Sequence, residues 1–409
     1  MRSFKMTDTF KKNLVNDAIL ILSSAYIGYF SWVSCHGHLI LLLFIPLLWI
    51  MASNRYTAYL VFYVYLMLAS RGLIEGATIF LSETHHYLQA VALCLVKSLL
   101  GTFPFLIFWH SQPTKKSICL ALAFVFTYIV PPFSLVGVAN PIIAGAAALL
   151  PTGAGFLGLL VILAFILASC LSRRVLYTFS CVIVIAAALN FNVELKPIKA
   201  QDFYAVNTSL GRLASGSFNF ADDFDRAMLV FSDLRHRRLS GREETFVLLP
   251  ETIAGRSNRT NIDLWTNEIR RIIRSDQTVF WGGEIPREYF LYDNVIFMYH
   301  AGNTKYIAQR VPVPYSMYKG PFAESGARLH YFNSGVIALP DGRRAAMLIC
   351  YETFLTWPIL RSMFERPDIL LTASNLWWCR DTNLPEIQSN HVNLWSRLFG
   401  IPTASAVNM

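Results

Sequence analysis

The sequence is short of charged residues. Asp, Glu, Lys and Arg make up 15% of its 409 residues, whereas apolar residues reach 54%. A typical soluble domain carries about 25% charged residues. This composition excludes a chain that is soluble throughout and places at least one domain in a membrane. Gly and Pro number 22 and 18, which is close to average usage and excludes collagen-like and low-complexity classes.

Cysteine is also sparse and never occurs at CxxC spacing. The seven cysteines stand singly, which excludes a zinc ribbon and a disulfide framework, and we expect no metal or cofactor. A net charge of +9 would indicate a nucleic-acid partner only if the excess formed a patch on a soluble face. Much of it lies in short loops between apolar segments, so no direct nucleic-acid partner is expected.

The first half consists of apolar runs separated by short loops. Most runs approach the roughly 20 residues that a helix needs to cross a bilayer, so we predict a membrane domain over 1–195 with about seven transmembrane helices. The piece 141–151 is half a span long with proline at both ends, and we predict that it is re-entrant or interfacial. The runs are 13–33, 37–52, 57–80, 88–109, 117–137, 153–171 and 175–191.

Basic residues in the loops predict which side of the membrane each loop faces. Cytoplasmic loops carry an excess of Lys and Arg. Basic residues precede the first run and follow the second, fourth and sixth, whereas the loops 34–36, 81–87 and 138–152 contain none. With seven spans every basic loop is cytoplasmic, and the chain emerges on the outer face after residue 191.

Beyond residue 191, short β-rich runs alternate with helix-like stretches. Strands with continuously apolar interiors, separated by amphipathic helices, predict an α/β sandwich over 196–409. The β-rich runs are 203–209, 245–251, 278–284, 294–300, 335–340, 345–352, 368–374 and 401–408. The helix-like stretches are 221–239, 260–274, 354–366 and 384–399.

Two of these strands end in residues that can carry chemistry. Glu251 follows four apolar residues and a proline, and Cys350 follows Met-Leu-Ile. Active sites of α/β sheets form at strand ends, and a carboxylate beside a thiol can activate it for attack on an acyl carbon. Taken singly, Cys350 also fits a buried structural thiol, and Glu251 fits a helix cap or a surface group.

Short motifs follow one another in a fixed order across this half. They are Pro-Glu-Thr at 250–252, Asp-Asn at 293–294, Leu-Ile-Cys-Tyr-Glu at 348–352, Ser-Asn-x-Trp-Trp at 374–378, and Gln388 with Arg397. In this order they resemble the nitrilase, or carbon-nitrogen hydrolase, superfamily over about 200–409. The resemblance implies an αββα sandwich.

Two further resemblances extend into the membrane half. The Cys-Tyr-Glu triplet and the multispan N-terminal half are similar to apolipoprotein N-acyltransferase, whose nitrilase domain lies outside a bundle of membrane helices. The strings RVPVPYSM at 310–317 and WSRLFGIP near the C-terminus resemble TraB-type conjugal transfer proteins of bacterial plasmids, over essentially the whole chain. This resemblance implies a multi-pass protein of the bacterial inner membrane with a periplasmic C-terminal domain.

The resemblance to the nitrilase superfamily also implies roles for individual residues. Cys350 would be the nucleophile, Glu251 the general base and Glu352 an auxiliary acidic residue. The family's third catalytic residue is a Lys, but 306–312 contains none, and the nearest cation is Arg310. Arg can stabilise an oxyanion but cannot hand over a proton, because its pKa exceeds ~12. Lys305 and Lys319 are the alternatives.

Three ionisable residues lie inside the predicted spans: Arg71, Glu75 and Lys97. Intramembrane charge usually faces a cavity or a partner, which favours a functional site. The alternative is an internal ion pair near a helix end, with Lys97 reaching toward the interface.

Three functions compete at this stage. The first is a membrane-anchored acyltransferase or amidase that forms a Cys350 thioester on a membrane lipid or lipoprotein-like substrate. The second is a catalytically impaired assembly or maturation factor, whose partners would be components of the conjugation (type IV secretion) apparatus. The third, a transporter, depends on the three intramembrane charges alone.

Overall fold

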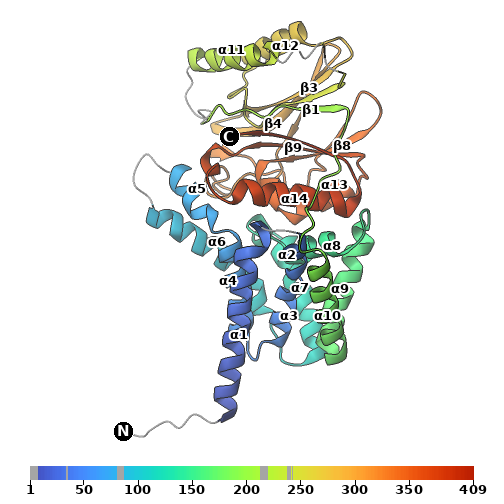
Figure 1. The fold of residues 1–409 in the computed structure, drawn as a ribbon. Coiled ribbons are helices and arrows are strands. Elements are labelled where there is room, and N and C mark those ends of the chain that lie inside the picture. Colours follow the sequence, from blue (N-terminus) through green and yellow to red (C-terminus); the bar gives the residue numbers. More distant parts are fainter. Residues whose placement is uncertain (1–7, 34–35, 81–86, 212–219, 237–240, 242) are drawn as a thin grey trace. The chain divides into compact units, whose positions relative to one another are not determined.

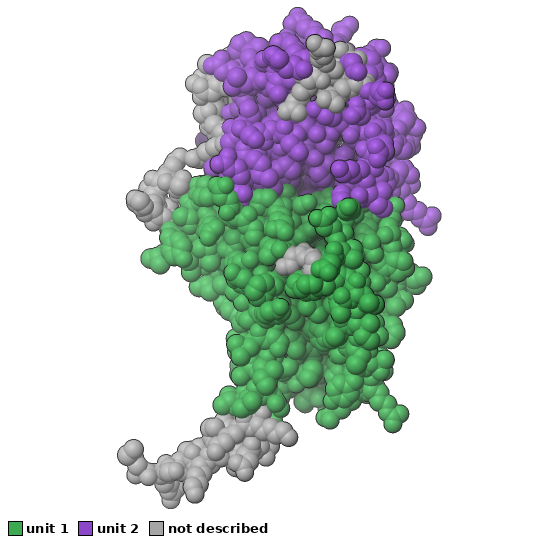
Figure 2. Space-filling model, in the orientation of Figure 1, with its two compact units in different colours: residues 1–196, 355–357, 381–400 green, residues 197–354, 358–380, 401–409 purple. Residues whose placement is uncertain are grey.

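A computed structural model describes residues 8–33, 36–80, 87–211, 220–236, 241 and 243–409 (Figure 1). The chain divides into two compact units. Unit 1 comprises residues 1–196, 355–357 and 381–400, and unit 2 comprises residues 197–354, 358–380 and 401–409 (Figure 2). The segment 381–400 therefore groups with the N-terminal helices and not with the strands that flank it in sequence.

Unit 1 is built of helices. Every apolar run predicted as a span contains at least one helix, and the half-length piece 141–151 contains α8. The helices are α1 (Asp8–Phe30), α2 (His36–Leu41), α3 (Phe44–Met51), α4 (Arg55–Ala69), α5 (Gly72–Phe80), α6 (Tyr87–Ile107), α7 (Pro113–Tyr128), α8 (Pro141–Leu149), α9 (Gly155–Leu171), α10 (Arg173–Leu189) and α14 (Leu384–Phe399).

Two helical segments are long and apolar enough to cross a membrane, Asn13–Val33 and Tyr87–Ile107. The pair α4 and α5, bent by 54°, makes a third if it is counted as one span. The other apolar helices are shorter, so this measure supports fewer spans than the predicted seven. Residues 34–35 and 81–86, in loops predicted to face outward, lie outside the described residues.

Helix α8 is held at both ends by polar side chains of unit 1. Asn140 caps its N-terminus, because its Oδ1 accepts hydrogen bonds from the N–H groups of Ile142 and Ile143. At the other end Arg397 of α14 donates to the carbonyls of Ala147 and Leu150, at 2.7 and 3.2 Å. These carbonyls would otherwise lack partners at the helix C-terminus, so α14 completes the hydrogen bonding of α8.

Unit 2 contains two β-sheets. The larger has the strand order β1-β2-β3-β4-β5, with β6 paired to β4, and the smaller has the order β10-β9-β8-β7. Strands β1 to β3 are mutually parallel, as are β8, β9 and β10. The strands are β1 (Phe203–Ala205), β2 (Phe246–Leu248), β3 (Thr278–Pro286), β4 (Phe290–His300), β5 (Asn303–Ala308), β6 (Ser325–Ala327), β7 (Val336–Ala338), β8 (Arg344–Ile349), β9 (Ile369–Asn375) and β10 (Thr403–Asn408).

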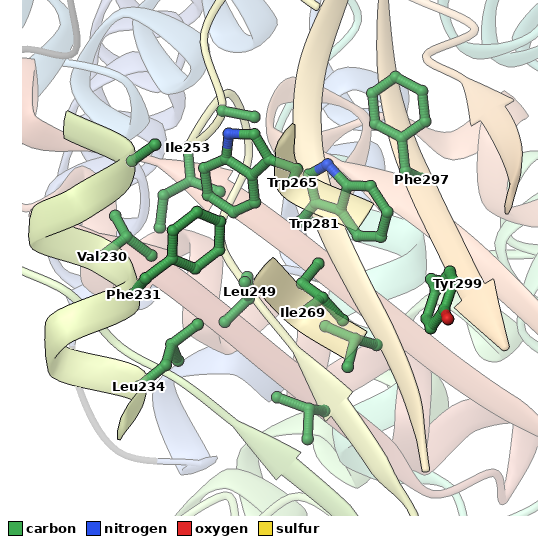
Figure 3. Packing of buried hydrophobic residues seen from close by; sticks show 14 of the residues in the cluster. Val230, Phe231, Leu234, Leu249, Ile253, Trp265, Ile269, Trp281, Phe297 and Tyr299 are labelled. Carbon is green, nitrogen blue, oxygen red and sulfur yellow. The ribbon is translucent and has the colours of Figure 1, made fainter. Parts of the chain in front are cut away.

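Helices α11 (Phe220–His236) and α12 (Arg259–Ile272) cover one face of the larger sheet, and the smaller sheet lies on the other side (Figure 1). Aromatic rings fill the space beneath these helices: Phe231 of α11 contacts Trp265 of α12, whose ring stacks near Trp281 of β3 (Figure 3). Each fully buried side chain of this size contributes about 1.5–3 kcal/mol. The short helix α13 (Thr356–Met363) follows the smaller sheet's strand β8 in sequence.

All eight predicted β-rich runs contain strands, and all four helix-like stretches contain helices, so these predictions are confirmed. Strands β5 and β6 were not predicted. Most of β5 is exposed and polar, because it is the edge strand of a hairpin, and so it lacks the apolar run used to find strands. Its turn, Ala301-Gly302, has positive φ at both residues, as two-residue hairpins of type I′ require.

Candidate active site

Glu251 and Cys350 lie just beyond the ends of parallel strands in the two sheets of unit 2. Cys350 follows β8 directly and adopts a left-handed φ of 48°, a strained conformation for a residue with a Cβ. Glu251 follows β2 by three residues. Gly282 makes room for this turn, since a Cβ there would lie 2.2 Å from the Thr252 nitrogen and 2.5 Å from the Glu251 Cα.

The structure brings the two predicted catalytic residues together. The Cys350 thiol and the Glu251 carboxylate are hydrogen-bonded, and both side chains are buried. The carboxylate also accepts hydrogen bonds from Asn294 Nδ2 at 2.6 Å and from the Asn375 N–H at 3.0 Å. These partners fix the carboxylate against the thiol.

Burial sets the proton affinities of the pair. It raises the pKa of Glu251 to about 7, although the hydrogen bonds from Cys350, Asn294 and Asn375 act in the opposite direction. Burial also raises the pKa of the Cys350 thiol well above its usual range, and the neighbouring Glu251 charge raises it further. The thiol is therefore protonated at neutral pH, and Glu251 is poised to accept its proton.

Gln309 and Asn294 extend the pair into a chain of amides. Gln309 Oε1 accepts from Asn294 Nδ2 at 2.9 Å, and Gln309 Nε2 donates at 2.9 Å to the carbonyl of Ile349, the residue before Cys350. Both side chains are buried. Gln309 was not predicted as a site residue, because only cations were considered in 306–312. The signal in the sequence was an amide directly after the Tyr-Ile-Ala run 306–308 and beside Arg310.

Arg310, predicted as the third catalytic residue, is bonded elsewhere. Its guanidinium pairs with Glu352 at 3.2 Å and donates to the Met347 carbonyl and to Ser362 Oγ. Further acceptors are the carbonyls of Ser334 and Pro358. These acceptors occupy the donors of the guanidinium, and none of the described contacts joins Arg310 to Cys350 or Glu251.

Glu352 links the Arg310 segment to the turn that carries Cys350. Its carboxylate accepts from the N–H groups of Arg310, Val311 and Ile349, in addition to the Arg310 guanidinium. Gly335 allows the guanidinium to lie close, because a Cβ at this position would be 2.3 Å from its central carbon. The Arg310–Glu352 pair, called the brace below, therefore holds the backbone of the turn that carries Cys350.

The two alternative cations are exposed. Lys305 lies on the exposed part of β5, opposite Met298. Lys319 Nζ donates to Ser325 Oγ at 3.2 Å. Neither lysine contacts Cys350 or Glu251 in the part of the chain that the structure describes.

Asp293, the other half of the predicted Asp-Asn motif, organises basic residues away from the thiol. It accepts hydrogen bonds from Arg287, Arg328 and His330. Burial raises its pKa, but these three bonds outweigh burial and hold the pKa well below its usual range. Asp293 thus ties the segment after β6 to β4.

Among the described residues, no cluster of three or more His, Cys, Asp and Glu side chains is arranged to hold a metal ion. What the site provides is a thiol, a carboxylate poised to accept its proton, and neutral amide donors around them. This set is suited to covalent acyl chemistry at Cys350.

The fold and the site describe a two-sheet α/β unit with a Cys-Glu pair, joined to a helical region with candidate membrane spans. The chain is homologous to curated proteins named conjugal transfer protein TraB. It is 29% identical to that of Agrobacterium fabrum, over 96% of this chain and 92% of the relative. It is 28% identical to a probable conjugal transfer protein TraB of Sinorhizobium fredii, over 97% of this chain and the relative's full length. These relatives confirm the TraB-type resemblance predicted from the motifs.

Solved structures similar to the chain are amidases of the nitrilase superfamily. An amidase from Nesterenkonia covers 50% of this chain and 75% of its own, with 15% identity and a TM-score of 0.37. A mutant of the Nesterenkonia AN1 amidase has the same coverage, with 14% identity and a TM-score of 0.36. No protein-family model matches the chain.

Proposed function

We propose that this chain is a membrane-anchored, nitrilase-fold protein of bacterial plasmid conjugal transfer. We further propose that it is a cysteine-dependent acyltransferase or amidase acting on a lipid or membrane-protein substrate. The observation that carries the proposal is the buried hydrogen bond between the Cys350 thiol and a Glu251 carboxylate whose pKa is raised to about 7. The names of the TraB relatives support the link to conjugation.

In the proposed acylation step, Glu251 takes the thiol proton and the Cys350 sulfur attacks the substrate's acyl carbon. The C–N or C–O bond of the substrate then breaks, and Glu251 gives the proton to the departing nitrogen or oxygen. The acyl group remains on Cys350 as a thioester. Water or an amine releases it by the reverse sequence, with Glu251 as the base.

The developing oxyanion needs donors, and neutral amides are the candidates. Gln309 Nε2 carries two N–H groups, of which one binds the Ile349 carbonyl. We assign the second to the oxyanion, in the role first predicted for a cation. One such donor is typically worth about a hundredfold or more in rate.

We also propose that the helical half crosses the bacterial inner membrane about seven times and that unit 2 is periplasmic, as the distribution of Lys and Arg indicates. A reporter fused at Met409 should then be active outside the cytoplasm, and one fused at Lys116 should be active inside it. Cytoplasmic activity of the Met409 fusion would contradict this topology.

The direct test of the chemistry is to trap the acyl-enzyme. The full chain, purified into lipid nanodiscs containing phospholipids with isotope-labelled acyl chains, is quenched in acid, and the peptide carrying Cys350 is weighed by mass spectrometry. We expect an acyl adduct on Cys350 and none on Cys379, and we expect Cys379 to stay unmodified in Cys350→Ala as well. An adduct that forms equally on Cys379 would contradict the proposal.

A second function, a non-catalytic assembly factor, is favoured by one observation. Among the described residues, an amide, Gln309, and no cation contacts the surroundings of Cys350 and Glu251, and Arg310 is bonded to Glu352. Plasmid transfer distinguishes the two functions. Normal transfer by Cys350→Ala cells, with wild-type protein levels, would favour the assembly factor.

A further inference from the structure

Unit 1 contains a cavity of about 390 Å³ that the catalytic proposal does not use. It lies at the break between α4 and α5, where the helix axis turns by 54°. Segments far apart in sequence line it: Arg71, Gly72, Ile74, Glu75, Tyr87, Asp381, Thr382 and Asn383. Two of the three ionisable residues predicted inside the spans therefore face one cavity.

Arg71 is fixed on one side and open on the other. Its Nη1 donates to the carbonyls of Tyr29 and Leu68, at 2.9 and 3.1 Å, and its guanidinium lies 4.0 Å from the centre of the Tyr29 ring. Among the described residues, its Nε and Nη2 have no hydrogen-bond partner. A guanidinium held in this way presents a forked pair of donors that matches a phosphate.

Asn383, which also lines the cavity, lies against Gly72. A Cβ on Gly72 would lie 2.1 Å from Asn383 Oδ1. Both polar atoms of the Asn383 amide are buried, and neither has a hydrogen-bond partner in the described part of the chain. A buried amide without partners requires an explanation, and a polar ligand in the adjoining cavity supplies one.

The start of α14 adds to the attraction for an anion. Asn383 is the N-cap residue of this 16-residue helix, yet its side chain makes no capping hydrogen bond. The Leu384 N–H donates to Thr382 Oγ1 at 3.1 Å, and Pro385 has no N–H, so the helix contributes mainly the positive end of its dipole, which favours a negative charge beside the Arg71 donors.

Carboxylates complete the lining. Glu75 is exposed and forms no ion pair with Arg71 or with any other described residue, although the two stand one helical turn apart. Asp381, two residues before Asn383 in the sequence, also lines the cavity. A site with a guanidinium and two carboxylates matches a zwitterion better than a simple anion.

We propose that this cavity binds a phosphodiester linked to a primary ammonium, as in the headgroup of phosphatidylethanolamine. Arg71 and the Asn383 amide hold the phosphate, and Glu75 with Asp381 holds the ammonium. The assignment to a membrane lipid rests on the proposed membrane-spanning function. A soluble glycerophosphoethanolamine has the same chemistry, and the experiment separates the two sources.

The test measures lipid retention by the full chain carrying Cys350→Ala, which cannot form a thioester. Native mass spectrometry follows binding from nanodiscs of phosphatidylethanolamine, phosphatidylglycerol or phosphatidylcholine. We expect phosphatidylethanolamine to bind about tenfold more tightly than the other two, because only it combines a phosphate with an N–H-donating ammonium. Equal retention of all three lipids would overturn the proposal.

Two charge variants test the phosphate-binding and the ammonium-binding parts of the site separately. Arg71→Gln should weaken all three lipids by about tenfold or more, whereas Glu75→Gln should lower phosphatidylethanolamine to the level of phosphatidylglycerol. Gly72→Ala, which displaces the Asn383 amide without changing charge, should weaken binding as well. Unchanged retention in Arg71→Gln would overturn the assignment.

Matched controls remove the same charges elsewhere in unit 1. Arg174→Gln and Glu194→Gln alter exposed side chains outside the cavity lining and should retain all lipids like the parent chain. A loss in Arg174→Gln equal to that in Arg71→Gln would mean that net charge alone governs retention, and the site would be rejected. Competition by glycerophosphoethanolamine at matched concentration would overturn the lipid assignment in favour of a soluble ligand.

The outcome is independent of the catalytic proposal. Selective lipid binding that requires Arg71, together with no acyl adduct on Cys350 in the chain with the native thiol, would reject the enzyme and keep the headgroup site. An acyl adduct on Cys350 with no lipid selectivity would reject the headgroup site and keep the enzyme.

Discussion

Two glutamates of unit 2 are buried to similar depth near the same turn, and their surroundings differ. Glu352 faces the Arg310 guanidinium and three backbone N–H groups. Glu251 faces one side-chain amide, one backbone N–H and a thiol. Positive charge is present in the first case and, among the described residues, absent in the second.

This difference separates the structural role of Glu352 from the proposed role of Glu251 as a base. A buried carboxylate paired with a guanidinium and hydrogen-bonded throughout is a fixed element of the fold. A buried carboxylate with only neutral donors keeps a pKa near neutrality and can exchange a proton. The buried Arg310–Glu352 pair thus supports the turn that carries Cys350, and among the described residues no cation contacts Glu251.

The largest expected effect comes from removing the Cys350–Glu251 pair itself. Cys350→Ala should abolish acyl-adduct formation, and Glu251→Gln should lower its rate about 10²–10⁴-fold, because no base takes the thiol proton. Timed acid quenching and mass spectrometry measure both rates.

The exposed thiol Cys181 supplies the control for these variants. Cys181→Ala should form the adduct on Cys350 at the wild-type rate. A Glu251→Gln chain that acylates Cys350 as fast as the wild type would contradict the role of Glu251 as base.

The second effect concerns the brace. Arg310→Ala leaves Glu352 buried without its partner, which should lower the free energy of unfolding by roughly 3–5 kcal/mol. Hydrogen exchange should accelerate at the N–H groups of Val311 and Ile349, which donate to Glu352. Denaturation of the full chain and exchange mass spectrometry of these peptides check the two outcomes.

Arg274→Ala is the matched control, since it breaks an exposed ion pair with Asp276. It should leave both measurements at the wild-type level. If Arg310→Ala instead folds normally and only slows acylation, Arg310 acts on the reaction, and the role first predicted from the family resemblance is correct.

Much of this arrangement was predictable because strand ends are local features of the sequence. Glu251 and Cys350 each follow an apolar run directly, so their projection from strand ends followed from the pattern. Their meeting depends on which strands lie opposite one another in two sheets. Short runs do not encode that pairing, and only the order of motifs pointed to it.

The bonding of Arg310 to Glu352, and not to the Cys350–Glu251 pair, has a physical reason. The prediction replaced the family's catalytic Lys by the nearest positively charged residue, Arg310, and placed it beside Cys350. Arg310 and Gln309 are neighbours at the end of β5, so their side chains point in different directions. The amide faces Asn294, and the guanidinium faces Glu352. Likewise, the grouping of α14 with unit 1 depends on contacts such as Arg397 with α8, which a motif order does not contain.

The third effect is a pH dependence. Below pH 7 the Glu251 carboxyl is protonated and cannot accept the thiol proton, so the rate of Cys350 alkylation by iodoacetamide should fall about tenfold per pH unit. Above pH 7 the dependence should level off. Cys379, whose pKa burial raises to about 12, should show no break near pH 7, and neither should Cys350 in Glu251→Gln. A Cys350 profile without a break would contradict the raised pKa of Glu251.

The smallest effect tests the comparison most directly, because it places near Glu251 a positive charge of the kind that Arg310 presents to Glu352. Gln309 is linked to the Glu251 carboxylate through Asn294, so the new ammonium of Gln309→Lys lies near that carboxylate. An opposite charge at such range should lower the pKa of Glu251 by roughly 1 unit or more. The break in the Cys350 alkylation profile should therefore move from near pH 7 to near pH 6 or below. Gln309→Met, which removes the amide without adding charge, should not move the break downward.

If Gln309→Lys and Gln309→Met shift the break equally, loss of the amide and not gain of the charge is responsible. Slower acylation in Gln309→Met with an unmoved break would place the amide on the oxyanion, whereas unchanged acylation there would exclude it as a donor.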